Sequence, residues 1–272
     1  MTSALIITAP GINCDLELAE AFHLAGAEPQ LVHINKLMRN PSLIDKADLI
    51  GFPGGFSYGD AVAAGRIMAN LMRATLYGAL VEAIRRGVPI IAPCNGFQIA
   101  VQLGLLPGPI PGSDWPQTPP SPTVSLAQNT SARFIDRWVE FIVPSSTRCV
   151  WTKNLDTTPE GSCIPIAHGE GRFVPRDEET LQELEESGQI ACRYGANDNP
   201  NGSVGDVMGI CDASGLVFGL MPHPERFLRW TQHPQWTRIE QQTKVPLGLQ
   251  MFNNAVEHAK ENNTSNCVEG TA

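Results

Sequence analysis

The segment "VPIIAPCNGFQIAVQLG" (88–104) places a cysteine between an apolar run typical of a buried strand and the start of a helical pattern. A cysteine at such a junction lies in a tight turn with its side chain raised above the sheet, and Gly96 lets the turn pack closely. The N-terminus of the following helix favours the nucleophilic thiolate. Cys94 is therefore a candidate nucleophile, although a buried structural cysteine would fit the same local sequence.

A second segment, "GLMPHPER" (219–226), offers the partners that a cysteine nucleophile needs. The prolines on either side of His223 favour an extended backbone, in which residues two apart project to the same side. We therefore expect Glu225 to fix the tautomer of His223 while the other imidazole nitrogen faces the thiol. This is the nucleophile, base and orienting group of a Cys-His-Glu triad.

A glycine-rich segment, "GFPGGFSYGDAVAAG" (51–65), follows a predicted strand. Exposed backbone amides at Gly54 and Gly55, with the amide of Asn95, could hold a developing oxyanion. A plain turn is the alternative, because glycine pairs are common in turns. The spacing does not fit a dinucleotide fingerprint, and the sequence contains no GxxxxGK[ST] phosphate loop, so we expect no ATP site in this chain.

Strands and helices alternate in the first hundred residues, which predicts βαβ units and a parallel sheet. The expected strands are 4–9, 29–34, 48–55 and 88–93, and the expected helices are 15–25, 61–86 and a helix over 96–103. In such sheets ligands bind at the carboxyl ends of the strands. The glycine-rich segment and the cysteine turn both follow strand ends, so we expect them to share one pocket.

The second half of the chain has a different pattern. A stretch with seven prolines (106–123) predicts a surface loop. The strands expected beyond it are 137–143, 163–169, 189–194, 204–212 and 215–224, and the expected helices are 177–187 and 246–260. We therefore predict one α/β domain over 1–261, with a mostly parallel central sheet, flanking helices and extra antiparallel strands, followed by a flexible tail over 262–272.

Composition narrows the class of protein. The net charge of −9 argues against binding to nucleic acid or an anionic membrane. No apolar run reaches the ~18 residues of a membrane-spanning helix, and the N-terminus lacks the features of a signal peptide. The seven scattered cysteines show no zinc-binding spacing, so we expect neither a metal nor a disulfide framework, and a cytoplasmic location.

Seven motifs together resemble a known family. "APGINCD", "GGFSYGD", "PCNGFQ", "NTSARFIDRWV", "PIAHGEGRFV", "NPNGS" and "GLMPHPER" occur in this order, as in the glutaminase subunit of phosphoribosylformylglycinamidine synthase. That subunit is a class I glutamine amidotransferase with a flavodoxin-like fold, and it acts in purine biosynthesis. The resemblance covers most of residues 4–226, and "GGFSYGD" and "NPNGS" separate this family from other triad glutaminases.

The resemblance implies roles for individual residues. Cys94 would attack the side-chain amide of glutamine, His223 would relay the proton and Glu225 would orient it. Gly55 and Asn95 would stabilise the oxyanion, whereas Gly54, Phe56 and Gln98 would bind the substrate. The "HGEGRF" segment (168–173) would form a pocket wall or partner surface, with His168 as a general base only a weaker idea. Cys14 follows the first strand and could reach the same sheet edge, but it receives no catalytic role.

The resemblance also implies partners. Ammonia would pass to a separate synthetase subunit that carries ATP and magnesium, with a small accessory subunit as a further partner. The proline-rich insertion at about 109–123 and the segment 227–245 depart from the family pattern, which leaves the details of assembly open. Two alternatives stay open: a free-standing cysteine amidohydrolase for another substrate, and a non-catalytic subunit of the same fold.

Overall fold

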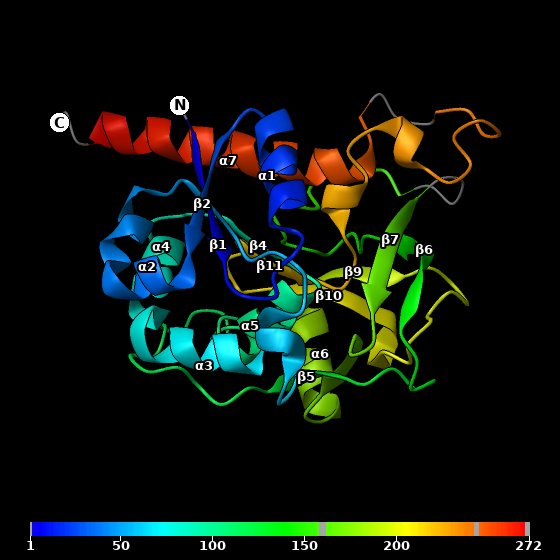
Figure 1. The fold of residues 1–272 in the computed structure, drawn as a ribbon, viewed down its shortest axis with the longest axis horizontal. Helices are drawn as coiled ribbons and strands as arrows, with labels where there is room; N and C mark the ends of the chain where they lie inside the picture. The colour runs from blue at the N-terminus through cyan, green and yellow to red at the C-terminus, as the bar shows by residue number, and fades with distance from the viewer. Residues whose placement is uncertain (1, 158–161, 242–244, 270–272) are drawn as a thin grey trace.

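A nine-stranded sheet between two layers of helices forms the body of the protein (Figure 1). The structure is a computed structural model that describes residues 2–157, 162–241 and 245–269. The strand order is β2-β1-β3-β4-β11-β10-β9-β6-β7. The sheet therefore combines strands from both halves of the chain.

One half of this sheet is parallel. Its strands are β2 (Glu28–His33), β1 (Ser3–Thr8), β3 (Leu49–Gly51), β4 (Ile90–Pro93) and β11 (Val217–Leu220). The other half is antiparallel and contains β10 (Val207–Cys211), β9 (Ile190–Tyr194), β6 (Ile135–Ile142) and β7 (Cys163–His168). The short strands β5 (Val124–Ala127) and β8 (Arg172–Pro175) form a separate antiparallel pair. The predicted α/β fold with a parallel core is confirmed.

Helices cover both faces of the sheet. They are α1 (Asp15–Leu24), α2 (Ile34–Arg39), α3 (Arg66–Thr75), α4 (Tyr77–Arg85), α5 (Asn95–Leu103), α6 (Glu178–Glu186) and α7 (Leu247–Glu269). Successive residues of β1 enter different cores because side chains alternate along a strand. Leu5 and Ile7 pack with α3, α4 and α5, whereas Ala4 and Ile6 pack with α1 and α7. Figure 1 shows these two helical layers on opposite sides of the sheet.

Several predicted boundaries are wrong. The helix predicted over 61–86 is two helices, α3 and α4, with an angle of 76° between them. The fully buried Leu76 separates them, and this bend lets both helices pack into one core. Three short elements were not predicted: α2, β5 and β8, which contain only 6, 4 and 4 residues. Such short elements give too few residues for a periodic pattern.

The last helix is longer than predicted. α7 continues to Glu269, beyond the expected end at Lys260 and into the segment predicted as a flexible tail, of which residues 270–272 lie outside the described residues. Two polar side chains hold its extension against the rest of the chain. Asn262 donates a hydrogen bond to the carbonyl of Arg86 at 2.7 Å, and Asn263 donates to Asp48 at 2.9 Å. The polar residues at 262 and 263 therefore anchor this part of the helix.

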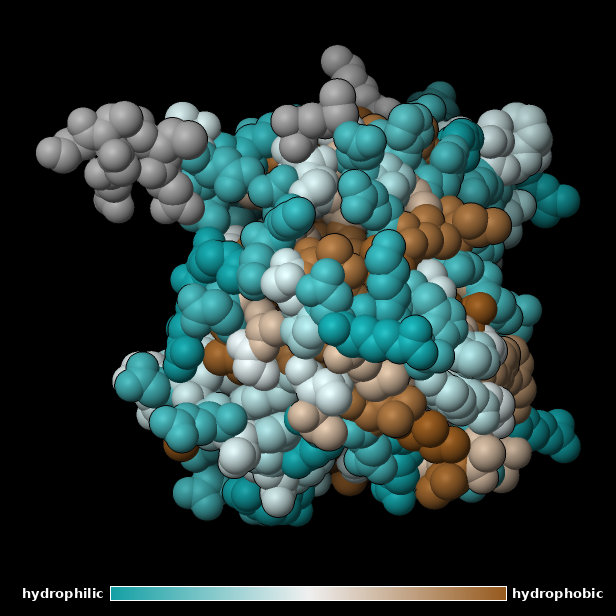
Figure 2. Space-filling model, turned by 60° about the vertical axis from the view of Figure 1, so that its left-hand side comes forward, coloured by the Kyte–Doolittle hydropathy of each residue, from teal (hydrophilic) through white to brown (hydrophobic). Residues whose placement is uncertain are grey.

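The proline-rich segment forms neither helix nor strand between residues 106 and 123, as predicted. Figure 2 shows one face of the molecule, where hydrophobic residues form short groups among mostly hydrophilic ones. In the part of the chain that the structure describes, no single helix is long and apolar enough to cross a membrane, and α3 with α4 meets that criterion only as a bent pair.

Candidate active site

The carboxyl ends of the parallel strands meet at one edge of the sheet. β1, β3, β4 and β11 run in the same direction, so the segments that follow them leave the sheet together. These segments contain Cys14, Gly55, Cys94 and His223, and all four residues line one cavity. The predicted shared pocket is therefore present in the structure.

Cys94 occupies a strained turn between β4 and α5. Its φ of 52° and ψ of −110° lie in a region that non-glycine residues rarely adopt, which is typical of a residue held at a functional site. The Cys94 amide donates to the carbonyl of Leu220 at 2.7 Å, which ties the turn to β11. Gly96 makes the turn possible, because a Cβ atom there would lie 2.0 Å from the carbonyl oxygen of Phe52.

We expect Gly96→Ala to destabilise the protein strongly, because the added methyl group meets backbone that cannot move cheaply. The cost should be about 3 kcal/mol or more, at the upper end of overpacking substitutions. Gly78→Ala is the matched control, since a Cβ atom on Gly78 in α4 meets nothing within 4 Å. Urea unfolding of both variants measures the difference, and equal midpoints would contradict the expectation.

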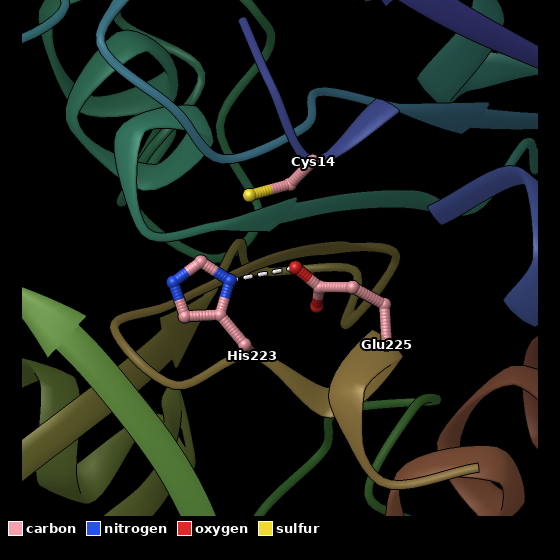
Figure 3. A group of neighbouring side chains, drawn as sticks. All are labelled: Cys14, His223 and Glu225. Carbon is pink, nitrogen blue, oxygen red and sulfur yellow. Dashed lines mark hydrogen bonds and ion pairs between the residues drawn. The ribbon is translucent and has the colours of Figure 1, made fainter. Parts of the chain in front are cut away.

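His223 and Glu225 form a buried hydrogen-bonded pair, with 2.7 Å between Nδ1 and Oε1 (Figure 3). The reason given from the sequence is wrong, however. β11 ends at Leu220, and Pro224–Arg226 forms a 3-10 turn, so this backbone is not extended. The turn itself brings the carboxylate back to the imidazole. Pro224 at the first position favours such a turn because its φ is already fixed near the helical value.

The surroundings of His223 favour its charged form. Burial lowers the pKa of His223, but the negative charges of Glu225 and of the Cys94 thiolate outweigh burial and raise it well above 6.5. Nε2 is buried and has no hydrogen-bond partner among the described residues. The nitrogen not used by Glu225 is therefore free for a proton transfer at the cavity.

The cavity has a volume of about 460 Å³, within the range of small-molecule sites. Two backbone amides at its edge are available as donors. The amide of Gly55 donates to no other described residue, and Asn95 is the first residue of α5, where an amide has no partner within the helix. Such amides are suited to a developing negative charge.

The predicted substrate-binding residues divide into two groups. Phe56 and Gln98 line the cavity, and the Gln98 amide donates to the carbonyl of Glu170 at 2.6 Å. Gly54, the third predicted residue, is not among the residues that line it. Gly54 lies against His223 instead, where a Cβ atom would approach the imidazole Cε1 to 2.8 Å. Glycine at this position therefore leaves space for the histidine ring.

The Asn95 side chain makes three hydrogen bonds within the site. Its Oδ1 accepts a hydrogen bond from the amide of Ser57 at 3.2 Å, and its Nδ2 donates to Asp60 at 3.2 Å and to Gln98 at 2.8 Å. The side chain thus connects the glycine-rich loop to the start of α5. This connection was not predicted, since a side-chain amide gives no distinctive sequence pattern.

Other cavity residues were also missed by sequence reasoning. They are the charged or amide side chains of Asn13, Asp60, Asp136 and Arg226, the aromatic Phe134, and two alanines, Ala64 and Ala167. The expected wall from the "HGEGRF" motif is present as His168, Gly169 and Glu170. Cys14 reaches the site as its position after β1 suggested, and its sulfur lies 3.2 Å from Nη2 of Arg226. Most missed residues lie inside the seven motifs, which were the available signal.

His168 is held neutral beside the cavity. Burial, with a smaller effect of His223, lowers its pKa to about 4. Asn129 Oδ1, which also accepts from the amide of Gly171, lies 3.1 Å from His168 Nδ1, so this nitrogen carries the proton. Because Nε2 then has only a lone pair, His168 is better suited to accept a hydrogen bond than to carry charge.

His168 should make the folded protein less stable in mild acid. The unfolded chain protonates this histidine below its ordinary pKa of 6.5, whereas the folded protein does so only near pH 4. The contribution of His168 to the free energy of unfolding is therefore fully present above pH 6.5. It falls by on the order of 3 kcal/mol between pH 6.5 and 4.

Urea unfolding across this pH range measures the slope. His168→Gln, whose amide can still donate to Asn129, should flatten it, whereas the exposed control His23→Gln should leave it unchanged. An unaltered slope in His168→Gln would show that other groups cause the acid sensitivity.

A strained cysteine, a histidine–carboxylate pair and free amides around one cavity are the arrangement of cysteine-dependent acyl-transfer enzymes. The CobB/CobQ-like glutamine amidotransferase domain matches residues 1–259. Phosphoribosylformylglycinamidine synthase subunit PurQ of Dehalococcoides mccartyi is 39% identical over 263 residues, which cover 94% of this chain and 97% of that protein. PurQ of Treponema denticola is 40% identical over 241 residues, covering 82% and 87%.

A solved structure agrees with the sequence relatives. A chain in the structure of PurLQS from Thermotoga maritima has a TM-score of 0.69 and 32% identity, covering 94% of this chain and 98% of that one. The chain therefore belongs to the PurQ family of glutamine amidotransferase subunits.

Proposed function

We propose that this protein hydrolyses glutamine to glutamate and ammonia, and supplies the ammonia to a phosphoribosylformylglycinamidine synthetase in purine biosynthesis. The observation that carries the proposal is that Cys94 and His223 line one cavity, while Glu225 holds His223 through a 2.7 Å hydrogen bond. Membership of the PurQ family supports the choice of substrate and pathway.

In the first step the Cys94 thiolate attacks the side-chain amide carbon of glutamine. The carbonyl electrons move to oxygen, and the amides of Gly55 and Asn95 stabilise the oxyanion. The charged His223 gives its Nε2 proton to the leaving nitrogen, and the carbon–nitrogen bond breaks. The products of this step are ammonia and a γ-glutamyl thioester on Cys94.

In the second step water hydrolyses the thioester. Neutral His223 accepts a proton from water, and the resulting hydroxide attacks the thioester carbon. Collapse of the second tetrahedral intermediate releases glutamate and restores the Cys94 thiolate and the charged imidazole. Glu225 keeps Nδ1 protonated throughout, so Nε2 alone exchanges the proton.

The cavity lining suits glutamine. Asp60, Asp136 and Glu170 place carboxylates around it, which favours the α-ammonium group of an amino acid. Phe56 and Gln98 complete the substrate site in this proposal. The amidotransferase step itself needs no cofactor from this chain, and ATP and magnesium belong to the synthetase subunit.

The cavity mouth is the proposed contact with the synthetase. Phe56 and Phe134 line the cavity, are 47% and 54% exposed, and have ring centroids 6.3 Å apart. Exposed aromatic pairs favour burial by a protein partner. A partner seated here would receive ammonia directly. By analogy with PurLQS, we also propose a small accessory subunit and, because the thiol must stay reduced, a cytoplasmic location.

A reconstituted complex tests this function. The chain is mixed with its synthetase, and glutamate release is measured from glutamine with and without that partner. We expect glutamine-dependent amidine formation in the complex and covalent labelling of Cys94 by a glutamine-mimicking electrophile. Full activity on another amide without the partner would instead identify a free-standing amidohydrolase.

A further inference from the structure

A second cysteine lies beside the His223–Glu225 pair. Cys14, from the loop between β1 and α1, points its sulfur toward the imidazole (Figure 3). One donor atom each from Cys14, His223 and Glu225 lie within 4.8 Å of one another, and all three residues are buried. Cys14 has no role in the proposed reaction, so its position beside His223 needs another explanation.

We propose that Cys14, His223 and Glu225 form an inhibitory site for a thiophilic divalent cation of the zinc type. The inhibition rests on the proposed glutaminase function, whereas the metal site itself does not. Binding would occupy the histidine and the carboxylate and thereby switch off the Cys94 nucleophile without touching it.

One donor has an unused atom, and the other two would exchange a present partner for the cation. Glu225 Oε2 is buried without a hydrogen-bond partner among the described residues, and Glu225 is only 2% exposed. His223 Nδ1 shares a proton with Glu225 Oε1, and Cys14 Sγ lies 3.2 Å from both Asn13 Oδ1 and Arg226 Nη2. Buried polar atoms without partners are costly and indicate a missing ligand or water. Arg226 Nη2 lies 3.2 Å from the Cys14 sulfur and would move aside on metal binding, and Glu17, which pairs with Arg226 at 3.0 Å, offsets part of its charge.

The chemistry of the donors selects the cation. Zinc binds Cys, His and carboxylate ligands at ~2.0–2.3 Å, which places tetrahedral ligands ~3.5 Å from one another. Small side-chain rotations would bring donors that now lie within 4.8 Å to these positions. A thiolate ligand favours Zn²⁺ over Mg²⁺ and Ca²⁺. Three protein ligands leave the fourth position open to water.

Metal binding would stop catalysis through His223. The thiol proton of Cys14 and the proton shared by His223 Nδ1 and Glu225 are released, and the cation takes their place. With the cation on Nδ1, the imidazole stays neutral with its proton on Nε2 and cannot take up a second proton. It can therefore no longer exchange the proton that the reaction at Cys94 requires.

Binding is tested directly and without reference to activity. Co²⁺ is titrated into the metal-free full-length chain, and Zn²⁺ then displaces it. We expect one equivalent to give the charge-transfer absorption of a thiolate–cobalt bond. Cys14→Ala should weaken binding by more than the ~10-fold that loss of an outer-shell partner costs. Cys94→Ala should bind normally, as should the control Cys163→Ala, which removes a half-buried thiol on β7.

Inhibition is then measured on the complex with the synthetase, relative to each variant's own metal-free glutaminase rate. Zn²⁺ should inhibit the wild type and Cys163→Ala, but Cys14→Ala only at concentrations more than ~10-fold higher. Unchanged binding in Cys14→Ala, or binding lost in Cys94→Ala, would overturn the proposal. If metal-free activity were absent while binding still required Cys14, the glutaminase function would fail and the metal site would stand.

Discussion

Cys94→Ala should abolish the use of glutamine while the complex still accepts ammonia. Without the sulfur no thioester forms, and the remaining oxyanion donors cannot replace the nucleophile. Loss of a nucleophile that acts as one unit with its base costs at least ~10⁴-fold in rate. The glutamine-dependent and ammonia-dependent rates of the assembled synthetase, measured with the same preparation, give the two values.

The matched control is Cys163→Ala, which removes a half-buried thiol away from the cavity and should keep both rates. If Cys94→Ala still formed product from glutamine, the thioester mechanism would be wrong. If a folded Cys94→Ala lost both rates equally, Cys94 would act in assembly and not in chemistry. The comparison therefore separates a nucleophile from the buried structural cysteine that the local sequence also allowed.

The buried strands of the parallel half were predictable because each is a local apolar run, whereas the edge strand β2 has a single buried residue. β1 and β4 are buried on both faces, so their sequences are continuously hydrophobic. α2, β5 and β8 are too short for a periodic pattern. The bend between α3 and α4 depends on the burial of Leu76 in a core assembled from distant segments, which no local window contains.

The site was predictable to the extent that strand ends determine it. Cys94 and Gly55 follow strands whose direction places them at one edge, and the sequence showed both strands. The 3-10 turn at Pro224 was not foreseen, because a proline is compatible with an extended chain and with the first position of a helical turn. Cys14 could be placed at the edge, but its contact with Arg226 depends on a tertiary approach.

Glu225→Gln should lower kcat for glutamine hydrolysis by ~10²–10⁴-fold. The amide has the shape of the carboxylate, but it no longer balances a charged imidazole, and its NH₂ group can donate to His223 Nδ1 and select the wrong tautomer. Glu225 does not line the cavity, so KM for glutamine should stay close to the wild-type value. Steady-state kinetics of the complex with varied glutamine measure both constants.

Glu17→Gln is the matched control for this substitution. Glu17 pairs with Arg226, the residue next to Glu225, and its side chain is 43% exposed, so the same chemical change is made nearby without contact to His223. The control should keep kcat within about threefold, as expected for a surface ion pair worth at most ~1 kcal/mol. A rise in KM with unchanged kcat in Glu225→Gln would place Glu225 in substrate binding. If kcat fell less in Glu225→Gln than in Glu17→Gln, Glu225 would have no orienting role. The buried 2.7 Å hydrogen bond to Nδ1 would then contribute nothing to proton transfer.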